Sequence, residues 1–249
     1  MSRLNRRLAV TKISADGTRD TRAGQVEVEE PLEIRAGGEQ IAHLFRTPGH
    51  DIELTHGILL AQGLIGSAED VATARYCEGA VGGENTYNLL NVDLRTAAPR
   101  FIDPIPGDAC GISSSQRIRE LATRLSVRPQ PAPIDADTIF ALPTQLDRAR
   151  NLPTARTGAI ERQDIDPANA VHKILGHLLI DASLPAPSPT LIVDFRVTFE
   201  VMRAAAAAGF ETVVSTADAT SMAVDLARET NTVLIGEVTP ERFSVYSGA

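Results

Sequence analysis

One short segment holds the residue with the clearest chemical potential. Residues 106–115 contain Cys110, one of two cysteines in the chain, followed by Gly111 and by three serines. The run 116–125 is rich in helix-forming residues, and small polar residues before such a run predict a helix start. A helix N-terminus favours the thiolate form of a nearby cysteine, which is the nucleophilic form. The segment therefore predicts a reactive cysteine on a glycine loop.

Packing is the competing interpretation of the cysteines. A lone cysteine is most often a small buried hydrophobe. The residues alone leave both a reactive and a buried Cys110 open. Cys77 has no glycine loop around it, and we assign it to packing or chance.

Composition limits the class of protein. The chain has 249 residues, which suits one large or two small domains, and 43% of them are apolar. A net charge of −8 argues against a general nucleic-acid binder. Two cysteines cannot form a disulfide framework or a four-cysteine zinc site. The basic N-terminus has no long apolar segment behind it, so we expect no signal peptide, no membrane span and a cytoplasmic protein.

The first hundred residues predict a small α/β unit. Residues 31–35 and 40–46 predict strands joined by a glycine turn at 37–38, and residues 52–60 predict a helix. Thr47 or Asp51 is the expected N-cap of that helix. The polar residues before position 25 predict a loose arm or an edge strand. We place the domain boundaries at 1–105 for this unit, 106–133 for the cysteine loop, helix and proline-rich linker, and 134–249 for a larger domain.

Strands and helices alternate in the larger domain. Strands are predicted at 190–194, 211–215, 232–236 and 243–246, and helices at 137–150, 167–179, 198–208 and 219–229. This order predicts a mostly parallel sheet covered by helices. Ligands of such sheets bind at the carboxyl ends of the strands. The candidate binding residues there are Arg196, Ser215, Glu237, Val238, Thr239, Pro240, Glu241 and Arg242.

Each of these candidates also has an ordinary interpretation. Arg196 could fork onto a phosphate, or it could be a solvated arginine at a helix start. The hydroxyls of residues 215–221 could cradle an anion at a helix N-terminus, or they could simply cap that helix. His172 and His177 are five residues apart, which does not place two metal ligands on one helix face. The sequence contains no zinc-deaminase signature, phosphate-binding glycine loop or serine-hydrolase elbow, and we expect no metal site.

Several segments spread along the chain carry one further signal. They are Thr47-Pro-Gly-His-Asp51, Ala109-Cys-Gly-Ile112, Asn169-Ala-Val171 with Lys173, Arg196-Val-Thr-Phe-Glu200, Ser221-Met-Ala-Val224 and the ending 236–246. Together they resemble one known family, the formate dehydrogenase accessory sulfurtransferases (FdhD/NarQ). The segment at 47–51 is similar to the family's N-terminal signature, and the segment at 109–112 to the first half of its cysteine loop.

The resemblance implies a fold and a function. It implies a cytidine-deaminase-like three-layer α/β/α domain without zinc. It also implies a sulfur carrier, in which a cysteine desulfurase loads a persulfide onto Cys110. That sulfur then passes to the molybdenum of a bis(molybdopterin guanine dinucleotide) cofactor destined for formate dehydrogenase, with residues 237–242 in the family's cofactor-binding segment. GDP is a surrogate for half of this cargo. The resemblance also implies a homodimer. We expect neither a nucleic acid nor a membrane as a partner.

The chain also departs from the family pattern. Ser113 stands where the family has a second loop cysteine, and Asp166-Pro-Ala168 replaces a Gly-Arg-His. About a dozen residues that carry a strand and a hairpin in the family are missing after Ala159. Arg242 alone keeps the basic character of the cofactor-binding segment. The alternative hypothesis is therefore a divergent paralogue that binds a nucleotide or a protein without transferring sulfur.

Overall fold

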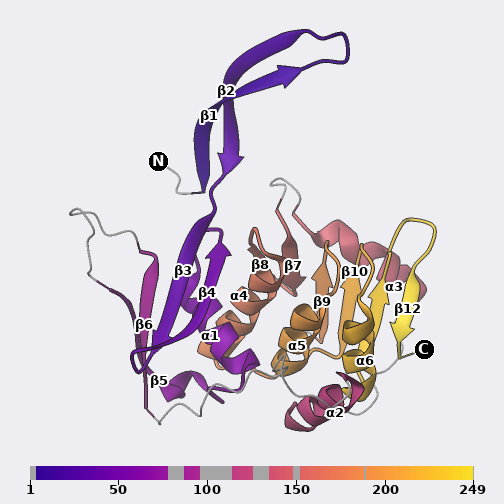
Figure 1. The fold of residues 1–249 in the computed structure, drawn as a ribbon. Coiled ribbons are helices and arrows are strands. Elements are labelled where there is room, and N and C mark those ends of the chain that lie inside the picture. Colours follow the sequence, from indigo (N-terminus) through magenta and orange to yellow (C-terminus); the bar gives the residue numbers. More distant parts are fainter. Residues whose placement is uncertain are drawn as a thin grey trace.

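The computed structural model describes residues 4–77, 87–95, 114–125, 135–147, 152–187 and 189–248. These residues form three sheets and six α-helices (Figure 1). In chain order the elements are β1 (Asn5–Ile13), β2 (Arg19–Glu27), β3 (Glu30–Ala36), β4 (Glu39–Arg46), α1 (Asp51–Ala61), η1 (Ala68–Asp70), β5 (Val71–Tyr76), β6 (Leu89–Leu94), α2 (Ser114–Arg124), α3 (Ala136–Ala141), η2 (Leu142–Gln145), β7 (Thr154–Thr157), β8 (Ile160–Gln163), α4 (Pro167–Ile180), β9 (Thr190–Val193), α5 (Phe199–Ala208), β10 (Thr212–Ser215), α6 (Ser221–Glu229), β11 (Val233–Gly236) and β12 (Ser244–Ser247).

The N-terminal part is organised by a four-stranded sheet in the order β4-β3-β6-β5. Alternate residues of β3 point to opposite faces, and Leu32, Ile34 and Ala36 are buried on one of them. That face packs on Leu54, Ile58 and Leu59 of α1 in one apolar cluster. The predicted small α/β unit is confirmed, with Gly37 and Gly38 turning between β3 and β4 at positive φ angles.

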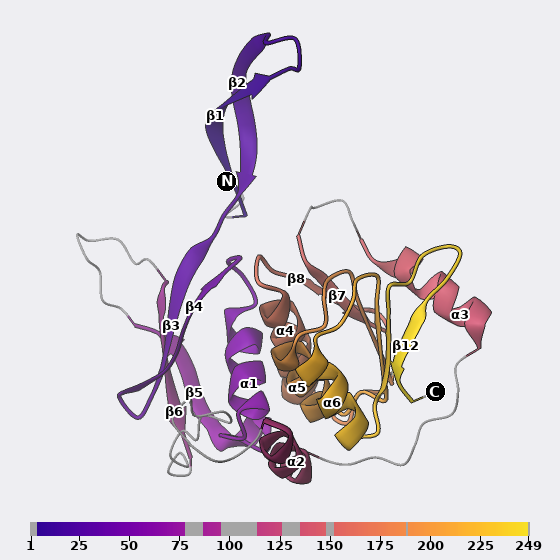
Figure 2. The same ribbon diagram turned by 45° about the vertical axis from the view of Figure 1, so that its right-hand side comes forward.

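The C-terminal part has a six-stranded sheet in the order β12-β11-β10-β9-β7-β8. Strands β9, β10 and β11 are parallel, as the alternation with α5 and α6 predicts. Helices α4, α5 and α6 cover one face of the sheet (Figure 2). On the other face, Ile139 of α3 packs on Val214, Ile235 and Val238. The three-layer α/β/α arrangement is thereby confirmed.

Helices α1 and α4 hold the two parts together by a very close crossing. A Cβ atom on Gly57 of α1 would lie 1.9 Å from the backbone oxygen of His172. A Cβ atom on Gly176 of α4 would lie 1.7 Å from the backbone oxygen of Glu53. Helix α1 is buried on nearly every side because it lies between the four-stranded sheet and α4 (Figure 2). The crossing therefore requires glycine at both positions.

Some local expectations are corrected. Neither Thr47 nor Asp51 caps α1: the N-cap is His50, in the left-handed region at φ 59°, without a side-chain capping bond. The helix predicted at 137–150 is shorter, because α3 ends at Ala141 and η2 continues only to Gln145.

The edges of the molecule are corrected as well. Of the two alternatives for the polar N-terminus, the loose arm is wrong: the segment forms strands, β1 and β2, which pair as a regular hairpin. The shortened segment after Thr157 still forms a strand pair, β7 and β8, around a tight turn at Gly158, so the sheet edge is present. The predicted helix start before residue 116 is confirmed by α2.

Replacing Gly57 or Gly176 with alanine should lower the free energy of unfolding by about 3 kcal/mol or more, because the added methyl group collides with helix backbone. Urea unfolding followed by circular dichroism measures this loss. The matched control is Gly66→Ala, whose Cβ would lie 3.7 Å from Asp70 Oδ2 and should change stability little. Equal stabilities of all three variants would contradict the close crossing.

Candidate functional site

The predicted binding residues meet at one end of the six-stranded sheet, where strands β9, β10 and β11 finish. We call this end the binding edge. Arg196 follows β9, Ser215 ends β10, and Glu237 follows β11. Main-chain hydrogen bonds join these loops: the Glu237 N–H donates to the Ala217 carbonyl at 2.8 Å, and the Val238 N–H to the Ser215 carbonyl at 3.2 Å. The sequence therefore predicted the proximity of these residues correctly.

The Arg196 guanidinium forks onto a carboxylate of the protein itself. Its Nε and Nη2 atoms lie 2.5 and 3.0 Å from the two carboxylate oxygens of Asp218. The hydrogen bonds from Arg196 hold the pKa of Asp218 below its usual range. Both side chains are exposed, and exposed ion pairs contribute little stability, so a phosphate could compete with Asp218 for the same fork.

Ser215 is buried and its hydroxyl is engaged within the protein. Its Oγ donates to the Phe195 carbonyl at 2.6 Å and accepts from the Ala217 N–H at 2.9 Å. These two bonds fix the loops after β9 and β10 relative to each other. Ser215 therefore holds these two loops in place, and its hydroxyl does not point freely at a ligand.

The segment 237–242 forms a turn beside an apolar hollow. The Thr239 hydroxyl accepts from the N–H groups of Glu241 and Arg242 at 3.3 and 3.2 Å. The Glu237 carboxylate accepts from Ser244 Oγ at 2.7 Å and from Tyr246 OH at 3.1 Å. The neighbouring hollow has a volume of about 760 Å³, which falls in the range of small-molecule sites. It is lined by Phe140, Pro143, Thr144, Leu146, Thr216, Val238, Thr239 and Pro240.

The predicted nucleophile, Cys110, lies outside the described residues. The helix that follows it in sequence, α2, packs its buried Ile118 and Ala122 into the apolar cluster beneath α6. Figures 1 and 2 both place α2 at the end of the six-stranded sheet opposite to the loop between β11 and β12. The structure thus does not bring α2 together with the predicted binding edge. Cys77 is half-buried after β5.

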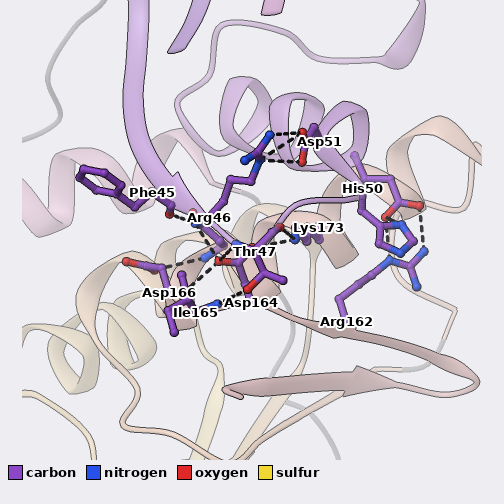
Figure 3. A network of polar contacts seen from close by, with 12 residues as sticks. Phe45, Arg46, Thr47, His50, Asp51, Arg162, Asp164, Ile165, Asp166 and Lys173 are labelled. Atoms are coloured by element: carbon purple, nitrogen blue, oxygen red, sulfur yellow. Dashed lines mark hydrogen bonds and ion pairs between the residues drawn. The ribbon is translucent and has the colours of Figure 1, made fainter. Parts of the chain in front are cut away.

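A second constellation of polar side chains lies where the two parts of the molecule meet (Figure 3). Arg46 at the end of β4 forms a buried ion pair with Asp51 at the start of α1, with Nη2 2.8 Å from Oδ2. Tyr76 OH donates to the same Asp51 oxygen at 2.7 Å, and Arg46 also contacts Glu30 at 3.1 Å. These bonds fix the turn between β4 and α1.

That turn is tied to the C-terminal part through Thr47 and Asp164. The Thr47 N–H donates to Asp164 Oδ1 at 3.3 Å, and its hydroxyl accepts from the Ile165 N–H at 3.0 Å. Lys173 Nζ lies 2.6 Å from Asp164 Oδ2 and donates to the Thr47 carbonyl at 3.0 Å. Asn169 donates to Asp164 and to the Phe45 carbonyl. We call this group (Thr47, Asp164, Asn169 and Lys173) the polar junction.

Glu53, beside the polar junction, is contacted by an arginine and two histidines. Arg162 Nε lies 2.6 Å from Glu53, and the ring nitrogens of His50 and His177 lie 3.0 and 3.2 Å from the same carboxylate. Burial alone would raise the pKa of Glu53, but the hydrogen bonds from Arg162 and His50 outweigh it and hold the pKa well below its usual range. The carboxylate is therefore ionised at neutral pH and anchors α1, α4 and β8 to one another.

His172, the other histidine of α4, has a different environment. His172 is buried against α1, and this burial, with the nearby charge of Arg203, lowers its pKa to about 3. It is neutral at physiological pH. Within the described residues no cluster of three or more histidine, cysteine, aspartate or glutamate side chains is placed to hold a metal ion. Nor is any described helix both long and apolar enough to cross a membrane.

Comparison with known proteins identifies what the chain is related to. A family model described as the FdhD/NarQ family matches residues 27–249. The chain belongs to the FdhD/NarQ family. The suspected relationship is thereby confirmed. Both segments of the polar junction lie within the matched residues, whereas β1 and most of β2 precede them.

Individual relatives support this membership. The sulfur carrier protein FdhD of Corynebacterium efficiens is 37% identical over 275 residues, covering 100% of this chain and 99% of the relative. The sulfur carrier protein FdhD of Nocardia farcinica is 38% identical over 246 residues, covering 92% and 88%. A crystal structure from Desulfotalea psychrophila, described as a formate dehydrogenase accessory protein, superposes with a TM-score of 0.73 at 18% identity and covers 98% of this chain and 97% of its own. The last similarity shows the shared fold.

Three residues of the polar junction, Thr47, Asn169 and Lys173, belong to segments that carry the family resemblance. Thr47 was predicted as a helix cap and through the family resemblance, Lys173 through the resemblance alone, and Arg46 and Arg162 were missed. Contacts between residues more than a hundred positions apart leave no periodic signal in one sequence. The available signal was the charged pair Arg46 and Asp51 flanking a proline–glycine turn.

Replacing Lys173 with methionine should destabilise the protein by about 3–5 kcal/mol, because it leaves the Asp164 carboxylate buried without its cation. The double variant Asp164→Asn with Lys173→Met should recover part of that loss. Chemical unfolding measures both. The matched control is Arg75→Met at the exposed Arg75–Asp93 pair, where a change within about 0.5 kcal/mol is expected. A Lys173→Met variant as stable as this control would contradict the role of the junction.

Proposed function

We propose that this protein is a cytoplasmic sulfur carrier that transports sulfur as a persulfide on Cys110 for the maturation of formate dehydrogenase. The observation that carries the proposal is the identity of 37–38% with sulfur carrier proteins over nearly the whole of both chains. The reactive-cysteine loop adds independent support from the sequence. A helix begins at Ser114, four residues after Cys110, and a helix start favours a thiolate near it.

The loading step is an exchange at sulfur. The Cys110 thiolate attacks the outer sulfur of a persulfide on a cysteine desulfurase. The bond between that sulfur and the desulfurase cysteine breaks, and its electron pair leaves with the desulfurase thiolate. A new S–S bond forms on Cys110, so no external oxidant or reductant is consumed. The chain has Ser113 in place of a second loop cysteine, so release of the sulfur depends on the acceptor.

The acceptor in this proposal is the molybdenum of a bis(molybdopterin guanine dinucleotide) cofactor, the substrate of the carrier. The hollow beside Val238, Thr239 and Pro240 is wide enough for a guanine base, and Arg196 is the nearby cation suited to a phosphate. Asp218 and Glu237 are acidic groups at the same edge, so binding of the phosphates should weaken as salt rises. Two copies of the chain act together in this proposal, since α2 and the binding edge lie at opposite ends of the sheet in one chain (Figure 1).

Incubating the protein with a cysteine desulfurase and free cysteine should add the mass of one sulfur atom to the intact chain. Cys110→Ala should abolish the addition, because alanine has no sulfur to attack the donor. The matched control is Cys77→Ala, which removes the half-buried cysteine and should label like the wild type. Non-reducing intact-mass spectrometry measures all three chains.

Labelling that persists in Cys110→Ala and is lost in Cys77→Ala would contradict the assignment of the carrier cysteine. A wild-type chain that takes up no sulfur, yet binds GDP in a calorimeter at low salt, would instead support the alternative of a nucleotide-binding paralogue. Ser113 and residues 166–168 depart from the family pattern, and these two measurements distinguish a sulfur carrier from a paralogue that only binds a nucleotide.

A further inference from the structure

The ion pair of Arg196 with Asp218 joins two loops of the binding edge. Arg196 follows β9 and Asp218 follows β10, and the guanidinium Nε and Nη2 atoms meet the two carboxylate oxygens at 2.5 and 3.0 Å. Two parallel bonds of this kind are the geometry in which an arginine also binds a phosphate. The Asp218 carboxylate therefore occupies the place on Arg196 that two phosphate oxygens would take.

The main chain holds the two side chains opposite each other. The Val197 N–H donates to the Asp218 carbonyl at 2.9 Å, and the Thr220 N–H donates to the Val197 carbonyl at 3.0 Å. Val197 and Ala219 form a parallel bridge between the same two loops. These bonds involve only main-chain atoms, so the side chains of the ion pair can separate and meet again without a change in either loop.

Both side chains of the pair can be reached from solvent. The exposed fraction is 62% for the Arg196 side chain and 42% for the Asp218 side chain. Exposed ion pairs contribute little stability, because water solvates both charges when they separate. A ligand that offers Arg196 a more highly charged partner can therefore displace Asp218 without unfolding any part of the binding edge.

The other charged groups of the binding edge do not offset the effect of Asp218. The Glu237 carboxylate accepts hydrogen bonds from two hydroxyl groups of β12. Glu241 and Arg242 are exposed neighbours of opposite charge in the turn that follows. While Asp218 neutralises Arg196, these groups give an approaching phosphate no net attraction. The position of the Asp218 side chain therefore controls whether the edge attracts an anion.

We propose that Asp218 competes with the phosphates of a bound nucleotide for Arg196 and so limits how tightly the binding edge holds its ligand. The proposal rests on the proposed function, in which this edge binds the guanine nucleotide part of the cofactor. A phosphate that reaches Arg196 breaks two bonds to Asp218 and forms two of its own, so only the difference between them stabilises the complex. When the ligand leaves, Asp218 takes its place on Arg196 again. A carrier must release its cargo, and this exchange favours release.

Replacing Asp218 with asparagine removes the competing charge with little change in size. In calorimetry at low salt, Asp218→Asn should bind GDP about tenfold more tightly than the wild-type chain, because Arg196 is then free for the phosphates. Guanosine, which has no phosphate, should bind both chains equally. The matched control is Glu229→Gln, which removes one negative charge at the exposed last residue of α6 and should leave the GDP affinity within about twofold.

A double-variant comparison separates competition for Arg196 from simple repulsion of the ligand. In a chain with Arg196→Gln, adding Asp218→Asn should change the GDP affinity by less than about twofold, because the group for which Asp218 competes is gone. A tenfold gain that persists in this chain would overturn the proposal. Equal GDP affinity of the wild type and Asp218→Asn, or no binding by either, would overturn it as well. Sulfur uptake by the wild-type chain tests the carrier function separately, so the failure of one is distinguishable from the failure of the other.

Discussion

The contact between α1 and α4 is the constraint on which the rest of the structure depends. The two helices meet backbone to backbone at Gly57 and Gly176, which leaves no space for any side chain between them. A crossing this close fixes the separation of the four-stranded sheet from the six-stranded sheet. The polar junction then fixes their rotation, because Lys173 reaches both Asp164 and the Thr47 carbonyl. Apolar burial alone would allow the two parts to slide.

The charged residues where the two parts of the molecule meet hold the structure together and are not free to react. Arg46, Asp51, Asp164 and Lys173 are buried and mutually neutralised. Buried ion pairs of this kind are costly to break, because removing one partner leaves the other charge buried without compensation. In the proposed function, the chemistry falls to the two ends of the larger domain. Helix α2 marks one end, and the loops that follow β9, β10 and β11 mark the other (Figure 2).

Much of the fold could be predicted from local pattern, because alternating apolar residues and short connections dictate parallel strands covered by helices. The convergence of Arg196, Ser215 and Glu237 followed from that topology. The pairing of Arg196 with Asp218 and the burial of Ser215 did not, since both depend on side-chain geometry between neighbouring loops. The pairing of β1 with β2 was not predicted, because a hairpin exposed on both faces carries no apolar alternation. The N-cap was misassigned because His50 adopts a left-handed conformation that favours glycine.

The central claim is that the chain is a working sulfur carrier whose activity depends on one thiol. Its most direct test is formate dehydrogenase activity in a bacterium that lacks its own member of this family and expresses this chain. The account predicts that the wild type and Cys77→Ser restore activity, whereas Cys110→Ser does not, because a hydroxyl cannot carry sulfane sulfur. Restoration by Cys110→Ser, or failure of a well-expressed wild type, would contradict the account.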